Sequence, residues 1–351
     1  MVKENKKRST NTRVKKKEHS IAYFDYSLLA ILICLICFGL VMLYSTSSYS
    51  AMMKQNGDSL FYFKRQVLFC IVGLIGMWIV SRIDYHWYFE RSKFFYFISI
   101  FFFFFVKIPL GKEVNGVNRW IKLLFGQQLQ IAIILFIPAL ICTMGREIKT
   151  LEGIVKVLAW GAFSAAVVFI ITENLSTAII VMGITCIMIF VVHPKTRIFI
   201  IIAVGIILIG IVGARVLGMA METSGNFRLR RILVWLNPEK YASEGGYQIM
   251  QALYAIGSGG FFGKGLGNSA QKMIIPEVQN DMILSIICEE LGLMGACGVL
   301  LLFGLVIWRL MVIATHTQEL FGTLLAAGVM GHILIQVILN VAVVTNTIPN
   351  T

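Results

Sequence analysis

The chain has 351 residues, of which 58% are apolar and only 14% are Asp, Glu, Lys or Arg, whereas roughly a quarter of the residues of soluble domains are charged. Together with a mean hydropathy of +0.80, this composition excludes a water-soluble globule. Lys and Arg exceed Asp and Glu by 13, an excess that would ordinarily suggest a nucleic-acid partner. Nearly half of it lies in residues 1–19, where eight basic residues face two acidic ones.

Residues 1–24 are predicted to form a basic cytoplasmic tail, since positively charged segments next to membrane helices stay inside. The basic region is long and no small-residue cleavage site follows the first apolar run, so we expect this run to remain as a membrane anchor. Such a tail suits anionic lipid headgroups or a cytosolic partner. No segment of the chain offers a nucleic-acid site.

Nine apolar runs are predicted to be membrane helices, which need about 20 residues to cross ~30 Å of hydrocarbon. They lie near residues 27–45, 66–81, 94–110, 129–143, 153–172, 174–193, 197–218, 282–308 and 321–344. Only helices and closed barrels satisfy their backbones in lipid. The predicted fold is therefore an all-α, polytopic membrane bundle, with helices one to seven within 25–218, a large extracytoplasmic loop at 219–281, and helices eight and nine with the start of the next outer loop at 282–351.

The large loop is expected to be ordered in part, because the stretches RLRRILVWL and YQIMQALYAI are amphipathic and suit short interfacial helices. Its segment GSGGFFGKG resembles a phosphate-binding loop but departs from that pattern, with Ser258 where a Gly is needed and Gly265 where a Ser or Thr is needed. A tight outward turn is the simpler interpretation. Lys264 could still meet an anionic headgroup there.

Three carboxylates near the eighth predicted helix each have more than one interpretation. Asn280 is a competent N-cap and Asp281 follows it, so Asp281 could serve only to start the helix. Glu289 and Glu290 fall inside the apolar run, where an ionised carboxylate costs ~2.5 kcal/mol or more and therefore faces a cavity or a partner. A proton relay, an internal salt bridge and direct chemistry all remain open for this pair.

Several arginines carry a similar ambiguity. Arg119, beside Trp120 in NGVNRWI, suits either an anchor at the headgroup level or a bidentate ligand of a diphosphate. The loop arginines Arg228, Arg230 and Arg231 are favoured as solvated or headgroup-facing residues. The seven cysteines all lie in apolar runs and the histidines have no metal-ligand spacing, so neither a disulfide nor a His or Cys metal site is predicted.

These segments together resemble one family. The run GYQIMQALYAIGSGGFFGKGLGNSAQKMIIPEVQNDMILSIICEELGLMGA, with ENLSTAII, NGVNRWI and NVAVVTNTIPNT, is similar to the SEDS family (shape, elongation, division and sporulation), and most like its cell-division branch, FtsW. The resemblance implies a bacterial inner-membrane peptidoglycan glycosyltransferase that polymerises lipid II into a growing glycan strand on the outer face. It also implies a class B penicillin-binding protein and other division proteins as partners.

Matching the family's motifs to this sequence assigns expected functional roles to residues of this chain. The family's essential Asp falls on Asp281, which overturns the helix-start interpretation. The same motifs include Gln248, Ser258, Lys272, Pro276 and Glu277, and Arg119 matches the family's NGxxRWI segment. Gln127 and Gln130 stand where the family usually has Glu and Lys, and the family continues past PNT into a tenth helix, so a C-terminally truncated chain is expected.

The expected chemistry joins a sugar 4-hydroxyl to the anomeric carbon of a lipid diphosphate donor. Such a displacement needs a base near the nucleophile and positive charge near the leaving group. Asp281 would deprotonate the hydroxyl or hold a divalent cation, Mg²⁺ or Mn²⁺, that does so, while Arg119, Lys264 and Lys272 are candidates for the diphosphate. A lipid II flippase or transporter and a non-enzymatic division scaffold are the alternatives.

Overall fold

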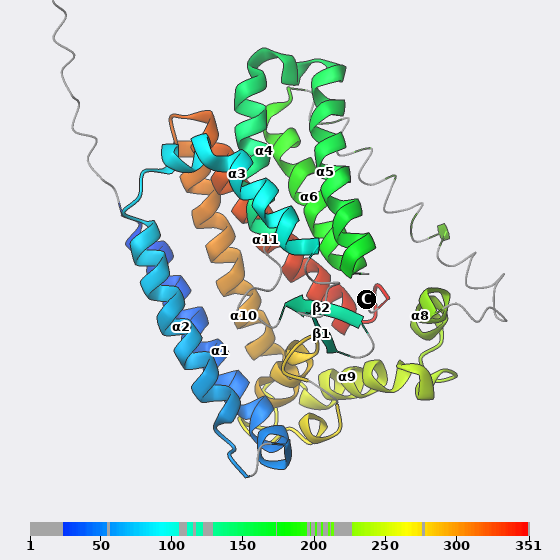
Figure 1. The fold of residues 1–351 in the computed structure, drawn as a ribbon. Coiled ribbons are helices and arrows are strands. Elements are labelled where there is room, and N and C mark those ends of the chain that lie inside the picture. The colour runs from blue at the N-terminus through cyan, green and yellow to red at the C-terminus, as the bar shows by residue number, and fades with distance from the viewer. Residues whose placement is uncertain are drawn as a thin grey trace, which may run out of the picture.

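The computed structural model describes residues 24–54, 57–104, 111–114, 117–121, 129–172, 174–194, 227–275 and 278–349, with isolated positions between 197 and 213. Side chains at 54, 103–104, 111–121, 129, 172, 227–230 and 244 are outside this description. The long helices are α1 (Tyr26–Lys54), α2 (Phe61–Val80), α3 (Tyr85–Phe104), α4 (Leu129–Met144), α5 (Leu151–Thr172), α6 (Leu175–Val192), α10 (Ile283–His316) and α11 (Leu320–Val344). These helices run mostly along one direction (Figure 1).

Seven helices in the described part of the chain are long and apolar enough to cross a membrane: α1, α2, α4 with the short turn after it, α5, α6, α10 and α11. They coincide with seven of the nine predicted runs, which confirms a polytopic helical membrane protein. The third run corresponds to α3, which is not among the seven and carries Glu90, Arg91 and Lys93 in its first half. The run at 197–218 lies almost entirely outside the described residues, so the predicted count of nine stays a prediction.

Several helices extend beyond their apolar runs. The first continues nine residues past the predicted end, to Lys54, and the third begins at Tyr85, nine residues before the predicted start. Hydropathy detects only the stretch that suits hydrocarbon, whereas backbone hydrogen bonds continue a helix into polar sequence. Thr46 and Ser47, which directly follow the first predicted run, are buried examples. Ser45, the last residue of that run, is also buried and bonds to a residue of α10.

The all-α prediction needs one addition, because β1 (Gly111–Val114) and β2 (Val117–Ile121) form an antiparallel hairpin. Gly111 pairs with Ile121 and Val114 with Val117, and the register shifts between Lys112 and Glu113. The connection between α3 and α4 therefore contains a hairpin. The NGVNRWI motif ends in its second strand.

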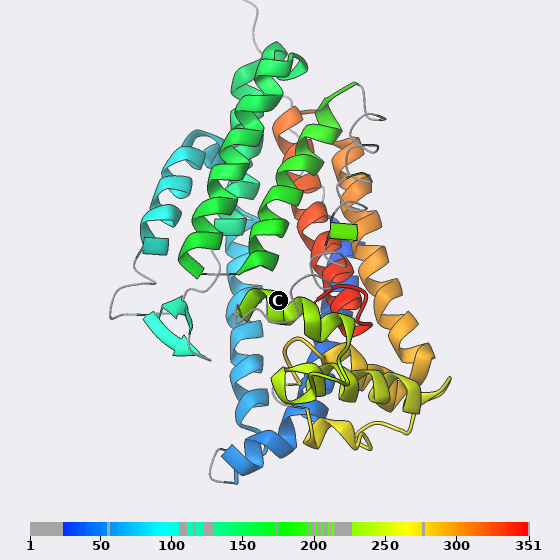
Figure 2. The same cartoon turned by 90° about the vertical axis from the view of Figure 1, so that its right-hand side faces the viewer.

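The main apolar core joins α3, α4, α5, α6 and α11. Tyr96 is fully buried, stacks on Phe136 with ring centroids 4.1 Å apart, and shares a 2.7 Å hydrogen bond with Ser164. Glycines on α11 allow close helix packing, since a Cβ at Gly331 would crowd Ile187 of α6. In Figure 2 this core lies in the upper part of the molecule, and α9 and its neighbouring loops lie at the lower end.

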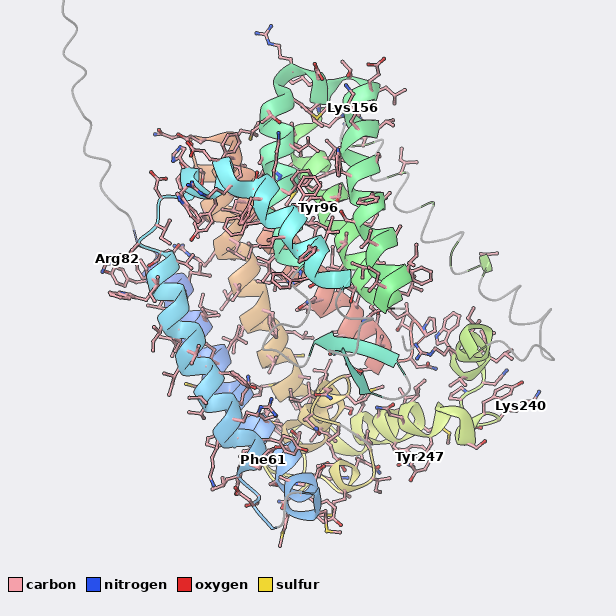
Figure 3. The ribbon with its side chains drawn as sticks, in the orientation of Figure 1. Phe61, Arg82, Tyr96, Lys156, Lys240 and Tyr247 are labelled. Carbon is pink, nitrogen blue, oxygen red and sulfur yellow. The ribbon has the colours of Figure 1, made fainter. Side chains whose placement is uncertain are left out.

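A second apolar core lies at the end of the molecule that carries Phe61 and Tyr247. Figure 3 shows this end opposite the end that carries Lys156. α9 (Gly246–Gly259) runs across this end (Figure 1) and packs against the start of α10. The contacts come from Ala252, Ala255, Ile275, Val278, Met282, Leu284 and Ile286. The segment before α10 is therefore held by buried apolar side chains.

At the opposite end of the bundle, polar side chains connect neighbouring helices. Asp25 accepts a 2.6 Å hydrogen bond from Arg309, which connects the start of α1 to α10. His86 at the start of α3 lies between the carboxylates of Asp84 and Glu319, at 2.6 and 2.8 Å. Tyr85 donates to the same Glu319 oxygen at 2.9 Å. The turn before α3 is thus bound to the turn before α11.

Candidate functional site

The predicted large loop contains the two expected amphipathic helices, α8 (Phe227–Leu236) and α9. α8 is fixed to the end of α11 by reciprocal contacts between Trp235 and Asn346. The indole N–H of Trp235 donates to the Asn346 carbonyl at 2.9 Å, and the Asn346 amide donates to the Trp235 carbonyl at 3.2 Å. Asn346 has a positive φ of 54°, a conformation that Asn tolerates better than most residues. The turn at Asn346, directly after α11, therefore packs against α8.

Helix α10 is interrupted at Gly292, which has φ 69° and ψ −170°. The glycine-rich segment inserts its backbone into this break. Lys264 N–H donates to the Glu289 carbonyl and Gly265 N–H to the Glu290 carbonyl, both at 2.9 Å. In return, Leu293 N–H donates to Gly260 at 3.0 Å and Met294 N–H to Phe261 at 3.2 Å. The four backbone groups that the break frees are thus satisfied, as a break within a membrane helix requires.

Glycine is required where the two backbones touch. A Cβ on Gly259 would overlap the Cys288 carbonyl, a Cβ on Gly263 would overlap the Glu290 carbonyl, and a Cβ on Gly292 would overlap Gly263 and Phe261. This explains the sequence GSGGFFGKG without a phosphate. Its N–H groups at 264 and 265 are used by α10, so the interpretation of the segment as a simple outward turn is incomplete.

Glu289 is completely buried beside the break and accepts several hydrogen bonds. Lys264 Nζ donates to Oε1 at 2.7 Å, and the Ser269 hydroxyl donates to Oε2. Weaker contacts of 3.3 to 3.4 Å come from Ser258 and from the backbone N–H groups of Ala270 and Gln271. A carboxylate with this many donors is compensated inside the protein.

Glu290 is equally buried but faces α1. Ser45 Oγ lies 2.7 Å from both carboxylate oxygens, and Lys272 Nζ lies 3.4 Å from Oε1. Lys272 also donates to the Gly267 carbonyl at 2.6 Å, and its side chain is only 7% exposed. We refer to Lys264–Glu289 and Lys272–Glu290 as the two glutamate ion pairs; both carboxylates are buried, whereas the Lys264 side chain is 38% exposed. They correspond to the internal salt-bridge alternative for the membrane glutamates.

Asp281 lies in the turn immediately before α10 and is exposed. Met282 occupies the N-cap position with no side-chain cap hydrogen bond, so the prediction that Asn280 caps this helix is wrong. The Asp281 carbonyl accepts a 3.2 Å hydrogen bond from the Asn340 amide of α11. Buried Val278 and Met282 flank the residue, at 1% and 0% exposure. An exposed carboxylate is thereby held on a fixed backbone at one end of the bundle.

The other predicted site residues fall into three groups. Ser258 and Lys264 lie together at Glu289, and the Lys264 side chain is 38% exposed. Gln248 is half-buried on α9, one turn before Ala252. Glu277, Pro276 and the side chains of Arg119, Arg228 and Arg230 lie outside the described residues.

Lys272 requires a correction. The prediction of a diphosphate ligand assumed an accessible ammonium, whereas the structure buries this group against Glu290 and Gly267. A ligand would have to displace both contacts. The geometry therefore favours a structural role for Lys272.

Three contributing residues were not identified from the sequence: Ser45, Ser269 and Asn340. Ser45 acts across 245 positions of sequence, and Asn340 contacts a residue 59 positions away. Ser45 at the end of one apolar run and Asn340 inside another give only a weak local signal, since polar groups there need partners. Ser269 lies in the loop and gives no such signal.

Across the described part of the chain, no three His, Cys, Asp or Glu side chains come together as metal ligands. Glu277, the nearest other carboxylate in the motif, lies outside the described residues. No step below is assigned to a cation.

The membrane helices, the interrupted α10 and the exposed Asp in the turn before it define a polytopic membrane protein with a candidate site at one end of the bundle. Residues 26–351 match the FtsW/RodA/SpoVE family model, described as cell cycle protein, and the chain belongs to this family. It is 36% identical over 335 residues to stage V sporulation protein E of Bacillus subtilis, covering 93% of this chain and 89% of that protein. It is 35% identical over 343 residues to the probable peptidoglycan glycosyltransferase FtsW of Trichlorobacter lovleyi, covering 95% and 87%.

Solved structures show the same fold. A chain from a peptidoglycan synthase complex superposes with a TM-score of 0.74 at 20% identity, covering 93% of this chain and 89% of that chain. The rod shape determining protein RodA of Thermus thermophilus gives a TM-score of 0.57 at 20% identity, covering 91% and 85%.

Proposed function

We infer that this chain is a peptidoglycan glycosyltransferase that polymerises lipid II into glycan strands during cell division. Its family membership and its relatives named as probable peptidoglycan glycosyltransferases support this inference. The observation that carries the mechanism is the exposed Asp281 carboxylate on a fixed turn before α10. Position in the family motif and geometry thus point to the same residue.

Asp281 acts as the general base in this proposal. Its carboxylate takes the proton of the acceptor 4-hydroxyl while the hydroxyl oxygen attacks the donor's anomeric carbon. The bond from that carbon to the diphosphate oxygen breaks, and the lipid diphosphate leaves with the bonding electron pair. A base within hydrogen-bond reach contributes typically 10²–10⁴-fold to such a step.

Positive charge near the diphosphate stabilises the departing oxygen. Arg119 is proposed for this role by its motif. Lys264 was the other candidate with an accessible side chain, but its ammonium already forms an ion pair with the buried Glu289, which favours a structural role. Gln248, Ser258 and Glu277 are proposed as substrate-binding residues by their motif positions. Ser258 is held beside this ion pair by a 2.8 Å contact with Lys264.

The proposed orientation places the N-terminal tail in the cytoplasm and the Asp281 end outside. The large loop at 219–281 then lies at the outer surface, where an amphipathic donor can keep its lipid tail in the membrane. A class B penicillin-binding protein is the proposed partner, with other division proteins around the pair. The structural similarity to a chain of a peptidoglycan synthase complex supports this choice.

Transport was favoured only by carboxylates within the membrane, and both of these are paired with lysines. The test is reconstitution of the chain with its penicillin-binding partner in liposomes that contain lipid II. We expect glycan polymer. Movement of lipid II across the bilayer without polymer would instead establish a transporter, and neither activity would leave the scaffold role.

A further inference from the structure

We propose that the two glutamate ion pairs are positioning elements for the reaction, and that their lysines hold residues 272–283, here called the Asp281 segment, rather than the substrate. This inference rests on the proposed function, because its readout is the rate of glycan polymerisation. It adds Glu289, Glu290 and Lys272 to the residues on which the reaction depends. None of the three needs to touch the reacting atoms.

The two pairs belong to one polar network. Lys272 N–H donates to Ser269 Oγ at 3.1 Å, and the same hydroxyl donates to Glu289. Glu289 binds Lys264, while Lys272 Nζ lies 3.4 Å from Glu290, which is held by Ser45 of α1. The network therefore joins α1, the glycine-rich segment and α10 at the point where α10 is broken.

The Asp281 segment is fixed to this network at both ends. Its N-terminal residue is Lys272, whose backbone N–H donates to Ser269 Oγ and whose ammonium donates to the Gly267 carbonyl. Its C-terminal side enters α10 at Ile283, two turns before Glu289. Between these points, Ile275, Val278 and Met282 are buried in the apolar core shared with α9. A shift of either ion pair would thus move the turn that carries the carboxylate.

The burial of these charges argues for a holding role. Both glutamates are fully buried and Lys272 is nearly so. Removing the partner of a buried charge leaves that charge uncompensated, so the surroundings must rearrange. Positioning is sensitive to such movement, since a displacement of about 1 Å can cost roughly 100-fold in rate. A lysine that bound the diphosphate in the ground state would instead alter KM.

The experiment measures kcat and KM for lipid II with the full chain and its penicillin-binding partner in liposomes. Glu289→Asp keeps the charge but shortens the side chain, and Lys264→Met removes the partner. We expect kcat to fall roughly 10- to 100-fold in each variant, with KM within about twofold of the unmodified protein. Lys264→Arg should retain most of the activity, and the double variant should lose no more than the worse single variant.

Lys64→Met is the matched control, because Lys64 forms an exposed pair with Asp58 at the same end of the bundle, at 3.1 Å. It should leave both constants unchanged. Folded protein is quantified by size-exclusion chromatography, and Glu289→Asp provides the answer if Lys264→Met does not fold. Unchanged kcat in folded Glu289→Asp, or a raised KM with unchanged kcat in Lys264→Met, would overturn the proposal. Absence of polymer from the unmodified protein would instead refute the proposed function.

Discussion

Replacing Gly292 with alanine tests whether the break in α10 depends on the absence of a side chain. Gly292 adopts φ 69° and ψ −170°, a region that is almost confined to glycine. Its hypothetical Cβ would also overlap the Gly263 backbone nitrogen and the Phe261 carbonyl. The inserted segment would have to withdraw from the break, so its backbone hydrogen bonds to Glu289, Glu290, Leu293 and Met294 would be lengthened or lost.

The magnitude follows from these two contributions. The backbone conformation costs about 1–3 kcal/mol for a non-glycine residue. Loss of most of the four hydrogen bonds, at about 1 kcal/mol each, raises the destabilisation to about 3–6 kcal/mol. We therefore expect the thermal unfolding midpoint of Gly292→Ala to fall by roughly 10 °C, and polymerisation to be lost with it because the Asp281 segment is displaced.

The measurement is thermal unfolding of the detergent-purified protein, followed by size-exclusion chromatography of heated samples. Gly298→Ala and Gly304→Ala in the same helix are matched controls, because a Cβ at either position meets nothing within 4 Å. These variants should be neutral or slightly stabilising, since Ala favours a helix more than Gly does. A Gly292→Ala protein as stable as the controls would refute the argument that the backbone insertion requires glycine.

Two further predictions concern contacts at opposite ends of the bundle. The hydrogen bond to the Asp84 carboxylate and the charge of Glu319 raise the pKa of His86 above its usual 6.5, although burial opposes this shift. The protonated His86 therefore stabilises the fold fully below about pH 6.5, and this stabilisation is lost as the pH rises through the raised pKa. The unfolding midpoint should therefore fall between pH 6 and 9 more in the unmodified protein than in His86→Gln, and equal slopes would contradict this. Trp235→Phe removes the indole hydrogen bond to Asn346 and should reduce the stability of the α8 contact by about 1 kcal/mol. We expect this loss to appear as faster proteolysis around α8. Unchanged cleavage would show that this contact does not hold the helix.

The membrane helices could be predicted from sequence, because each apolar run must find a helical conformation in lipid. Their ends could not, since helices such as α1 and α3 continue into polar sequence where hydropathy no longer reports on them. The hairpin at 111–121 was missed because its strands are only four and five residues long. Strands this short leave too few residues for an alternating pattern to be detected.

The candidate site was predicted as separate parts. Glu289 and Glu290 attracted attention because charges in a membrane helix need partners, and Lys264 and Lys272 attracted attention as cations near the motif. No local sequence pattern indicated that these lysines pair with these glutamates, because the pairing depends on the loop that enters the break at Gly292. A glycine directly after the two glutamates and a leucine was the available signal, and it is the residue that permits the break.

The most direct test of the account is the rate at which Asp281→Asn polymerises lipid II in liposomes with the penicillin-binding partner. Asn keeps the shape of the side chain but cannot accept the proton of the acceptor hydroxyl. Asp58→Asn is the matched control, because Asp58 is an exposed carboxylate at the same end of the bundle. We expect Asp281→Asn to lose at least about 100-fold in kcat, while the control polymerises normally. Polymerisation by folded Asp281→Asn at the rate of the unmodified protein would contradict the assignment of the base.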